Sequence, residues 1–356
     1  MAVLDQPADV REGESLDASA VASFLEENVD GFSGSVDIQQ FPSGFSNLTY
    51  LITGGGRELV LRRPPFGKKA ATAHDMGREY RILSALHPVF PYCPRPLAYT
   101  EDESIIGAPF YVMERIKGII LRRKLPDGLS LSPTDATALC RNMVDLLCRL
   151  HGLDYKAIGL ENFGKPQGYV QRQVNGWARR FRDAKTPDVP DFEEVISWLG
   201  KNQPPDTPFP CIIHNDYKFD NLVLHPENPL DIIGILDWEM TTLGDPLMDL
   251  GCSLAYWVNR DDPDEMQLLV MQPTHLEGMM TRKQIVDLYA EISGRDIQNM
   301  DFYYAFGIFR LAVIAQQIYY RYYHGQTKDK RFASLGFGVA LFEKAAMRVM
   351  EGSGAI

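Results

Sequence analysis

The stretch HNDYKFDN at positions 214–221, followed by ILDWE at 235–239, decides how the rest of the chain is interpreted. Asp216 precedes Asn221 by five residues, and Asp237 ends a later apolar run. The residues between Asn221 and Asp237 contain two short apolar runs, which predict a β-hairpin. The spacing therefore predicts that one short loop presents Asp216 and Asn221, and that the hairpin returns Asp237 beside them.

These three side chains are of the types that phosphoryl transfer requires. One carboxylate, that of Asp216, would orient an acceptor hydroxyl and take its proton. The amide oxygen of Asn221 and the carboxylate of Asp237 would hold Mg²⁺ against phosphate oxygens. A single aspartate in a loop is more often a cap or a turn residue, but the combination at this spacing favours the catalytic interpretation.

Outside this stretch the residue patterns predict an α+β fold. Before residue 117 they indicate a small β-rich region, with helices over 15–29 and 70–86, strands over 36–41, 48–53, 58–62 and 110–114, and a hairpin turn at 54–56. From Lys117 onward long helical patterns dominate, as in 134–150. We therefore expect an N-terminal leader and helix (1–30), a small N-lobe (31–116) and a helical C-lobe (117–356).

Composition excludes several classes of function. The net charge of −11 argues against duplex nucleic acid as a partner. The five cysteines form no C-x-x-C pair, and the N-terminus has no export signal, which together predict a cytoplasmic protein. The apolar stretch 302–318 contains Arg310 and two glutamines, so it predicts a buried helix and no membrane span.

The chain resembles the aminoglycoside phosphotransferase and choline kinase-like family, and within it the subgroup associated with acyl-CoA dehydrogenases. The residues that carry this resemblance are GFSNLTY at 44–50, VLRRPP at 60–65, REY at 78–80, the stretch 214–221 and the segment 237–251. The resemblance implies a bilobal protein-kinase-like fold and a small-molecule kinase. It also implies Asp216 as the catalytic base, with Asn221 and Asp237 as the Mg²⁺ ligands.

The resemblance further implies an ATP site. The turn from Gly44 to Thr49 would cover the phosphates, since glycine permits close backbone approach, and Glu114 to Ile116 would face the adenine. The residues expected to contact the nucleotide are Gly44, Ser46, Asn47, Thr49, Arg62, Glu79, Glu114, Ile116 and Lys218. Lys218 follows the base by two residues, so it contacts the transferred phosphate or is simply solvated.

One position departs from the family pattern. A lysine usually stands on the third strand and pairs with a helix glutamate, but here the matching residue is Arg62, with Glu79 as the expected partner. Because strand residues alternate faces, only one of Arg62 and Arg63 can point inward, and we choose Arg62. Arginine keeps the charge but not the geometry of lysine, which leaves open a nucleotide-binding pseudokinase.

Three residues near the base are expected to have structural roles. His214 is expected to brace the turn by hydrogen bonds, and Asp249 to tie the following helix to the loop. Asn215 stands where many relatives have glycine, and we expect it to adopt a left-handed conformation, which asparagine tolerates.

The acceptor is expected to be a small-molecule hydroxyl, because no long segment for docking a peptide follows Asp237. The segment 171–182, called here the arginine segment, holds four arginines and no acid, and Lys68, Lys69 and 122–124 add basic residues. If they converge, they suit an anionic acceptor such as a hydroxyacyl-CoA. An aminoglycoside kinase stays open, and so does an aromatic cage within 302–323. The sequence leaves undetermined the acceptor, the choice between ATP and GTP, the effect of Arg62 on turnover and the oligomeric state.

Overall fold

The protein is described from a computed structural model, which covers residues 4–42, 47–66, 75–327, 329–352 and 356. The chain divides into two compact units: the smaller comprises residues up to 120 and the segment 222–239, and the larger comprises 121–221 and 240–356. The chain thus leaves the larger unit after Asn221 and returns to it at Met240. The boundary predicted after residue 116 does not include this excursion, and as a domain boundary it stays a prediction.

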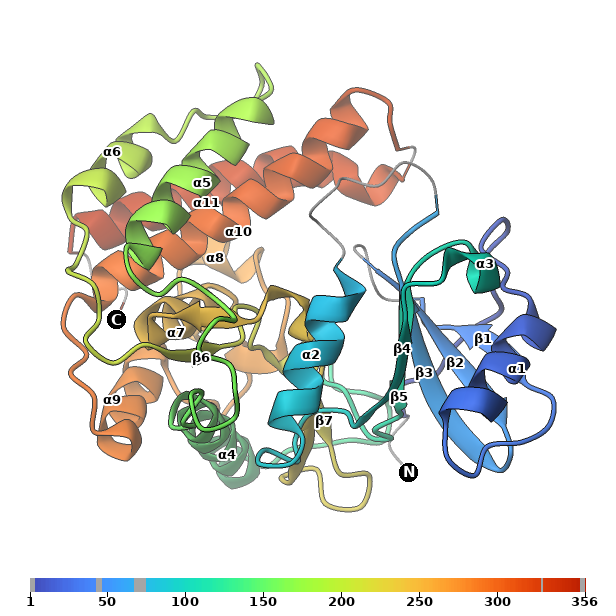
Figure 1. Ribbon diagram of the computed structural model, residues 1–356. Helices are drawn as coiled ribbons and strands as arrows, with labels where there is room; N and C mark the ends of the chain where they lie inside the picture. Colours follow the sequence, from blue (N-terminus) through green and yellow to red (C-terminus); the bar gives the residue numbers. More distant parts are fainter. Residues whose placement is uncertain (1–3, 43–46, 67–74, 328, 353–355) are drawn as a thin grey trace. The chain divides into compact units, whose positions relative to one another are not determined.

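The smaller unit is built around an antiparallel sheet (Figure 1). In spatial order the strands of this sheet are β1 (Asp37–Gln40), β2 (Leu48–Gly54), β3 (Arg57–Arg63), β5 (Phe110–Glu114) and β4 (Pro96–Thr100). Gly55 and Gly56 connect β2 to β3 with φ angles of 56° and 71°. Positive φ at both central residues is typical of a tight hairpin turn, so the predicted turn is confirmed.

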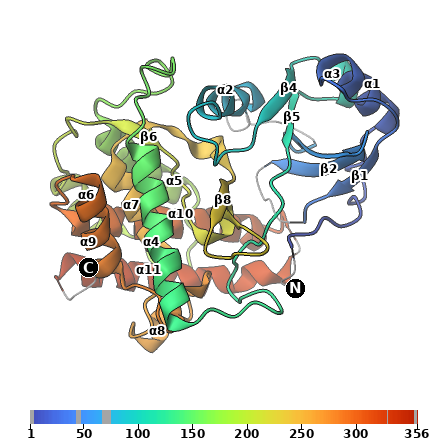
Figure 2. The same ribbon diagram turned by 90° about the horizontal axis from the view of Figure 1, so that it is seen from below.

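Helices cover both faces of this sheet. The helix α1 (Ala18–Asn28) begins at Asp17, whose side chain caps the amides of Ser19 and Ala20, and it packs Phe24 and Leu25 into the core on one face. The helix α2 (Met76–Leu86) lies against β4 and β5 on the other face, and the short α3 (Glu103–Ile106) contacts α1 (Figure 2). Alternate residues of β3 therefore face different helices.

The larger unit is mainly helical and is organised around the long helix α10. Its helices are α4 (Pro133–His151), α5 (Tyr169–Asp183), α6 (Glu193–Lys201), α7 (Pro246–Ala255), α8 (Asp264–Gln267), α9 (Arg282–Ser293), α10 (Met300–Tyr323) and α11 (Leu335–Met350). The 3₁₀ helices of the chain are η1 (Phe219–Asn221), η2 (Trp238–Met240), η3 (Pro273–His275) and η4 (Lys330–Ser334). Because α5, α6, α7 and α11 all pack on α10, that helix is buried along most of its length.

The burial of α10 confirms that the stretch 302–318 is a core helix. Within the described residues, no helix combines the length and apolar character needed to cross a membrane. The aromatic residues of α10 are mostly core residues as well, which favours packing over the cage that the sequence left open.

Two short antiparallel strand pairs lie within or next to the stretch 214–239, which holds the predicted catalytic and metal-binding residues. In the larger unit β6 (Cys211–Ile213) pairs with β9 (Thr242–Gly244), and in the smaller unit β7 (Leu222–Leu224) pairs with β8 (Ile232–Ile235). The hairpin predicted from the sequence is confirmed. The pattern missed β9, which is only three residues long, and β4, which begins at a proline in a proline-rich stretch. Proline is tolerated at the first residue of a strand.

Candidate active site

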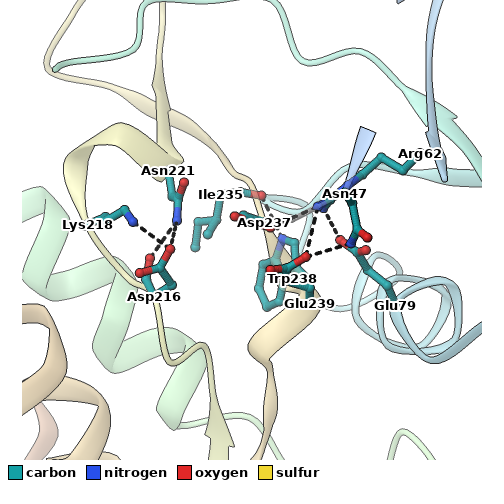
Figure 3. Close-up of polar contacts among 10 residues, drawn as sticks. All are labelled: Asn47, Arg62, Glu79, Asp216, Lys218, Asn221, Ile235, Asp237, Trp238 and Glu239. Atoms are coloured by element: carbon teal, nitrogen blue, oxygen red, sulfur yellow. Dashed lines mark hydrogen bonds and ion pairs between the residues drawn. The ribbon is translucent and has the colours of Figure 1, made fainter. Parts of the chain in front are cut away.

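Asp216, Lys218 and Asn221 lie together in the larger unit, in the loop that leads from β6 to η1 (Figure 3). The Asp216 side chain is 15% exposed. Its Oδ2 accepts hydrogen bonds from Lys218 Nζ at 2.7 Å and Asn221 Nδ2 at 2.9 Å, and its Oδ1 accepts one from the hydroxyl of Tyr256 at 3.3 Å. The solvated alternative for Lys218 is therefore wrong, because its ammonium is paired and mostly buried. The contacts hold the Asp216 carboxylate in one orientation.

The charges around Asp216 keep it ionised. Burial by itself raises the pKa of a carboxyl group, but Lys218 and Arg310 outweigh that effect and lower the pKa of Asp216 below its usual value. Lys218 has a raised pKa despite its own burial, with Tyr256 and Asp216 as neighbours, and its ammonium lies over the Tyr256 ring at 4.7 Å from the centroid. Asp216 and Lys218 thus form a charged pair at neutral pH.

The backbone of this loop is held from α7 and α4. Asp249 accepts the amides of His214 and Asn215, each at 2.7 Å, and also contacts His151 Nε2 at 3.1 Å. His214 Nδ1 in turn accepts the Asp216 amide at 3.3 Å. Asn215 has a φ of 66°, the left-handed conformation that the sequence predicts. The expected structural roles of Asp249 and His214 are confirmed by these contacts.

A second cluster lies in the smaller unit, around Arg62. Its guanidinium is buried and pairs with Glu79 of α2, with Asp237 at 3.1 Å and with Glu239 at 3.5 Å (Figure 3). The pairing with Glu79 confirms the sequence prediction. Burial raises the pKa of Glu79, an effect that Arg62 only partly offsets. The cluster therefore sets one buried cation against three acidic side chains.

Arg63 points to the other face of β3, as strand alternation requires. It donates hydrogen bonds to the carbonyls of Pro64 at 3.0 Å and Ile106 at 2.8 Å, and its guanidinium lies 3.7 Å from the centroid of the Phe66 ring. The choice of Arg62 as the inward residue is thus confirmed by geometry. Its role toward a nucleotide stays a prediction.

Asn221 in the larger unit and Asp237 in the smaller unit each carry an oxygen of the kind that a hard divalent cation binds. The amide nitrogen of Asn221 is used on Asp216, so its Oδ1 has no hydrogen-bond donor among the described residues. Asp237 has a φ of 66° at the end of β8, and its side chain is 36% exposed, with one oxygen on Arg62. Mg²⁺ prefers one or two carboxylate or amide oxygens together with phosphates and water.

The structure describes four of the other residues that were predicted to contact the nucleotide. Thr49 lies opposite Arg62 in the β2–β3 register, and Asn47 donates to Glu239 at 2.7 Å. Glu114 ends β5, where Arg57 and Arg95 each approach it at 3.7 Å. Ile116 fills the space beside Gly234, since its Cδ1 lies 2.7 Å from where a Cβ would stand. Gly44 and Ser46 lie outside the described residues, as do Lys68 and Lys69.

The sequence interpretation missed Glu239, Tyr256 and one role of Arg310. Glu239 contacts Arg62 and Asn47, and its signal was available because it stands two residues after Asp237. Tyr256 carries no local signal, since only the packing of the end of α7 brings its hydroxyl to Asp216. The sequence analysis used Arg310 only to identify a buried helix, whereas the structure shows that its charge also helps to lower the pKa of Asp216.

Comparisons with known proteins identify the family of this chain. Residues 37–275 match the family model described as "Phosphotransferase enzyme family". The chain is 37% identical to the mouse protein acyl-CoA dehydrogenase family member 10, over 90% of this chain and 30% of that protein. The chain spans less than half the length of the curated relatives it matches.

Solved structures share the fold. A protein from Ralstonia eutropha JMP134, provisionally assigned as an aminoglycoside phosphotransferase, has a TM-score of 0.80 and 30% identity, covering 95% of this chain and 99% of its own. A spectinomycin phosphotransferase, solved with ADP and spectinomycin, has a TM-score of 0.60 at 11% identity, covering 94% and 99%, and shows the fold alone. The resemblance and the kinase-like α+β fold are thereby confirmed. The chain belongs to the phosphotransferase enzyme family that includes the aminoglycoside phosphotransferases.

Proposed function

We propose that this protein is an ATP- and Mg²⁺-dependent phosphotransferase that moves the γ-phosphate to a hydroxyl group of a small molecule. The observation that carries the proposal is the Asp216 cluster, in which a mostly buried carboxylate is ionised beside Lys218 and oriented by Asn221. A general base must be oriented and unprotonated at the working pH, and Asp216 has both properties.

Each side chain of the cluster has a role in this proposal. The acceptor hydroxyl donates to Asp216 Oδ1, which accepts only the long Tyr256 hydrogen bond among the described residues, whereas Oδ2 already accepts two shorter ones. Asp216 takes the proton of the hydroxyl as the hydroxyl oxygen bonds to the γ-phosphorus, and the bond from that phosphorus to the bridging oxygen breaks, which releases ADP. Lys218 contacts the transferred phosphate. When bound to Asn221 and Asp237, Mg²⁺ supplies positive charge to the phosphate oxygens.

The nucleotide site in this proposal uses residues of the smaller unit. Arg62, positioned by Glu79, holds phosphate oxygens with its planar fork of donors. The other proposed nucleotide contacts are the turn with Gly44, Ser46, Asn47 and Thr49, and the segment from Glu114 to Ile116. The ADP held by the spectinomycin phosphotransferase supports a nucleotide as the donor.

The acceptor that we propose is anionic, such as a hydroxyacyl-CoA. The arginine segment supports an anion, because three of its arginines make no ion pair with a carboxylate in the described part of the chain and only Arg182 pairs, with Glu193. The name of the mouse relative, an acyl-CoA dehydrogenase family member, supports the acyl-CoA class. A polycationic aminoglycoside would need acidic side chains in place of these arginines.

A nucleotide-binding protein without transfer is the second candidate function. The observation that favours it is the engagement of Arg62 by Glu79, Asp237 and Glu239, because that guanidinium is already neutralised by acids. This candidate predicts nucleotide binding and no phosphorylated product with any acceptor.

Transfer from Mg-ATP to a panel of hydroxyacyl thioesters, hydroxy acids, amino alcohols and kanamycin, followed by mass spectrometry, tests the proposal. Asp216→Asn is expected to lower the rate by about 10²–10⁴-fold while nucleotide binding persists. Asp231→Asn, which makes the same charge change at the exposed tip of the β7–β8 hairpin, serves as the control. Transfer by Asp216→Asn at nearly the wild-type rate would remove Asp216 as the base.

A further inference from the structure

A cavity of about 350 Å³ opens in the larger unit beside the loop that carries Asp216. Its lining comes from α5, α10, β9 and the segments next to them, and contains no aspartate or glutamate. The charged and aromatic residues that line it are Lys165, Arg172, Arg180, Arg310, Tyr169 and Trp177. The arginine segment therefore converges on a cavity in part, through Arg172 and Arg180, whereas Arg179, Arg182 and residues 122–124 do not line it.

The positive charge of this cavity is only partly offset by the protein, through the electrostatic interaction of Arg310 with the Asp216 carboxylate. Among the described residues, no carboxylate forms an ion pair with Lys165, Arg172, Arg180 or Arg310. Arg172 donates to the carbonyls of Gln167 and Lys165. Partial desolvation of the Arg180 guanidinium by its neighbours, together with repulsion from Arg179 and Arg310, lowers the pKa of this otherwise exposed residue. Charges held together without counter-ions are costly, and an anionic ligand would relieve that cost.

An aromatic ring holds two of these cations in place. Trp177 lies 4.6 Å from the Arg180 guanidinium and 5.3 Å from that of Arg310, measured to the ring centroid. Cation–π contacts of this kind orient a guanidinium without neutralising its charge. Arg310 is only 5% exposed, so its position is fixed by the packing of α10. The donors are thus arranged before any ligand arrives.

The cavity is also next to the proposed base. Asn215 lines it and accepts the Tyr169 hydroxyl at 3.2 Å, and Asp216 is the following residue, about 3.8 Å away between Cα atoms across a trans peptide. The Asp216 carboxylate does not line the cavity, but it interacts electrostatically with Arg310, which does, so the base lies near the cavity.

We infer that this cavity binds the acidic group of the acceptor, a carboxylate or a phosphate, through Arg172, Arg180 and Arg310, and so presents the acceptor hydroxyl to Asp216. The inference rests on the proposed function for the identity of the ligand as an acceptor. Its volume suits a compact acidic group with a short chain. The shared chemistry is an anion, which a free hydroxy acid supplies as a carboxylate and a CoA thioester supplies as phosphates.

Direct binding measurements distinguish a carboxylate from the CoA phosphates as the group that the cavity binds. Straight-chain hydroxy acids of increasing length, each as the free acid, the CoA thioester and the uncharged methyl ester, are titrated into the protein by calorimetry without nucleotide. Binding of the free acid indicates a carboxylate ligand, and binding of the thioester alone indicates the phosphates. Methyl esters that bind as well as both charged forms would overturn the inference.

Two neighbouring arginines provide matched variants. Arg180→Glu and Arg179→Glu make the same charge change at adjacent exposed positions of α5, but only Arg180 lines the cavity. We expect Arg180→Glu to weaken binding of the charged probe about 10- to 100-fold. Arg179→Glu should change it far less, and Arg180→Lys should restore part of it. Both positions are exposed, so folding is expected to survive, which a melting curve verifies.

The transfer assay is read separately from binding. Equal effects of Arg180→Glu and Arg179→Glu on binding would overturn the inference, even if phosphoryl transfer is found. Charge-dependent binding that is lost only in Arg180→Glu supports the anion site, and transfer to the same probe then supports its role as the acceptor site. Such binding without transfer to any acceptor would instead contradict the proposed function and the acceptor role.

Discussion

Lys218 forms an ion pair with Asp216, and this pair gives a pH-dependent prediction. Its ammonium lies 2.7 Å from Asp216 Oδ2 and helps to lower the pKa of that carboxyl against the effect of burial. Removing the ammonium in Lys218→Met leaves burial less opposed, so the pKa of Asp216 rises. The acid limb of the kcat/KM profile, where the base becomes protonated, is therefore expected to move to higher pH.

The control for this prediction is Lys218→Arg, which keeps a positive charge and should leave the limb closer to its wild-type position. Rates are measured across a series of pH values with saturating Mg-ATP. An acid limb that does not move in Lys218→Met would show that Asp216 is not the titrating base.

Arg62 is expected to be important for stability as well as for binding. Its guanidinium is the buried partner of Glu79, whose own burial is nearly complete. Removing one member of a buried ion pair costs about 3–5 kcal/mol, because the other charge is left without a partner. Arg62→Met should therefore lower the free energy of unfolding by about that amount, as measured by urea denaturation.

The double variant Arg62→Met with Glu79→Leu separates charge from packing. It removes both members of the pair, so it should recover part of the lost stability. If the double variant is as unstable as the sum of the two single variants, the charges do not interact as the geometry indicates.

At the scale of elements, Asp249 joins α7 to the loop that carries Asp216. Asp249→Asn removes one acceptor oxygen, which leaves His214 or Asn215 with an unpaired buried amide at a cost of about 1–3 kcal/mol. The contacts, led by that with His151, outweigh burial and lower the pKa of Asp249. A lowered pKa stabilises the fold above the unfolded value of about 3.9, and this contribution is lost as the pH falls through the lower folded value.

The difference in unfolding free energy between wild type and Asp249→Asn is therefore expected to be largest near neutral pH and to become smaller in acid. Urea denaturation of both proteins over a series of pH values from neutral into the acid range measures it. A difference that stays constant throughout would contradict the pairing of an ionised Asp249 with the loop.

The contact between α7 and α10 depends on two glycines. A Cβ on Gly307 would stand 2.2 Å from the carbonyl oxygen of Gly251, and one on Gly251 would stand 2.3 Å from that of Tyr303. Gly307→Ala should destabilise the protein although alanine favours a helix by up to about 1 kcal/mol, because the backbones must separate. Gly338→Ala in α11, where a Cβ meets nothing within 4 Å, should instead stabilise it. Thermal unfolding of the two variants measures the contrast, and a stabilised Gly307→Ala would contradict the close contact.

At the scale of the whole molecule, nucleotide binding should raise the melting temperature. A ligand at 100 times its Kd stabilises the native state by about 2.7 kcal/mol. Mg-ATP is expected to give a shift that Asp237→Asn reduces, because that variant loses one carboxylate proposed to bind the metal. Parallel scans with GTP, and with ATP and chelator, identify the preferred nucleotide and the metal requirement. A shift with neither nucleotide at saturating concentration would contradict the proposed donor.

Several parts of the site were predictable because they are local. Asp216 and Asn221 are only five residues apart, so their presence in one loop was predictable. The inward direction of Arg62 follows from strand alternation. The left-handed φ of Asn215 was also predictable, since the residue type tolerates it. By contrast, Tyr256 and Glu239 meet their partners through packing over long separations, and no single-sequence pattern encodes such contacts.

By itself, the sequence determined the division into a β-rich and a helical part, the β7–β8 hairpin and the residues suited to phosphoryl transfer, because these depend on side-chain periodicity, turn chemistry and short spacing. Only the tertiary structure decided that Arg62 is surrounded by three acids, and that Arg172 and Arg180 meet Arg310 around one cavity. Arg310 comes from α10, far from α5 in the chain, and the packing of these helices brings their charges together. Charge interacts through space, so its effect depends on the fold and cannot be read from neighbours in sequence.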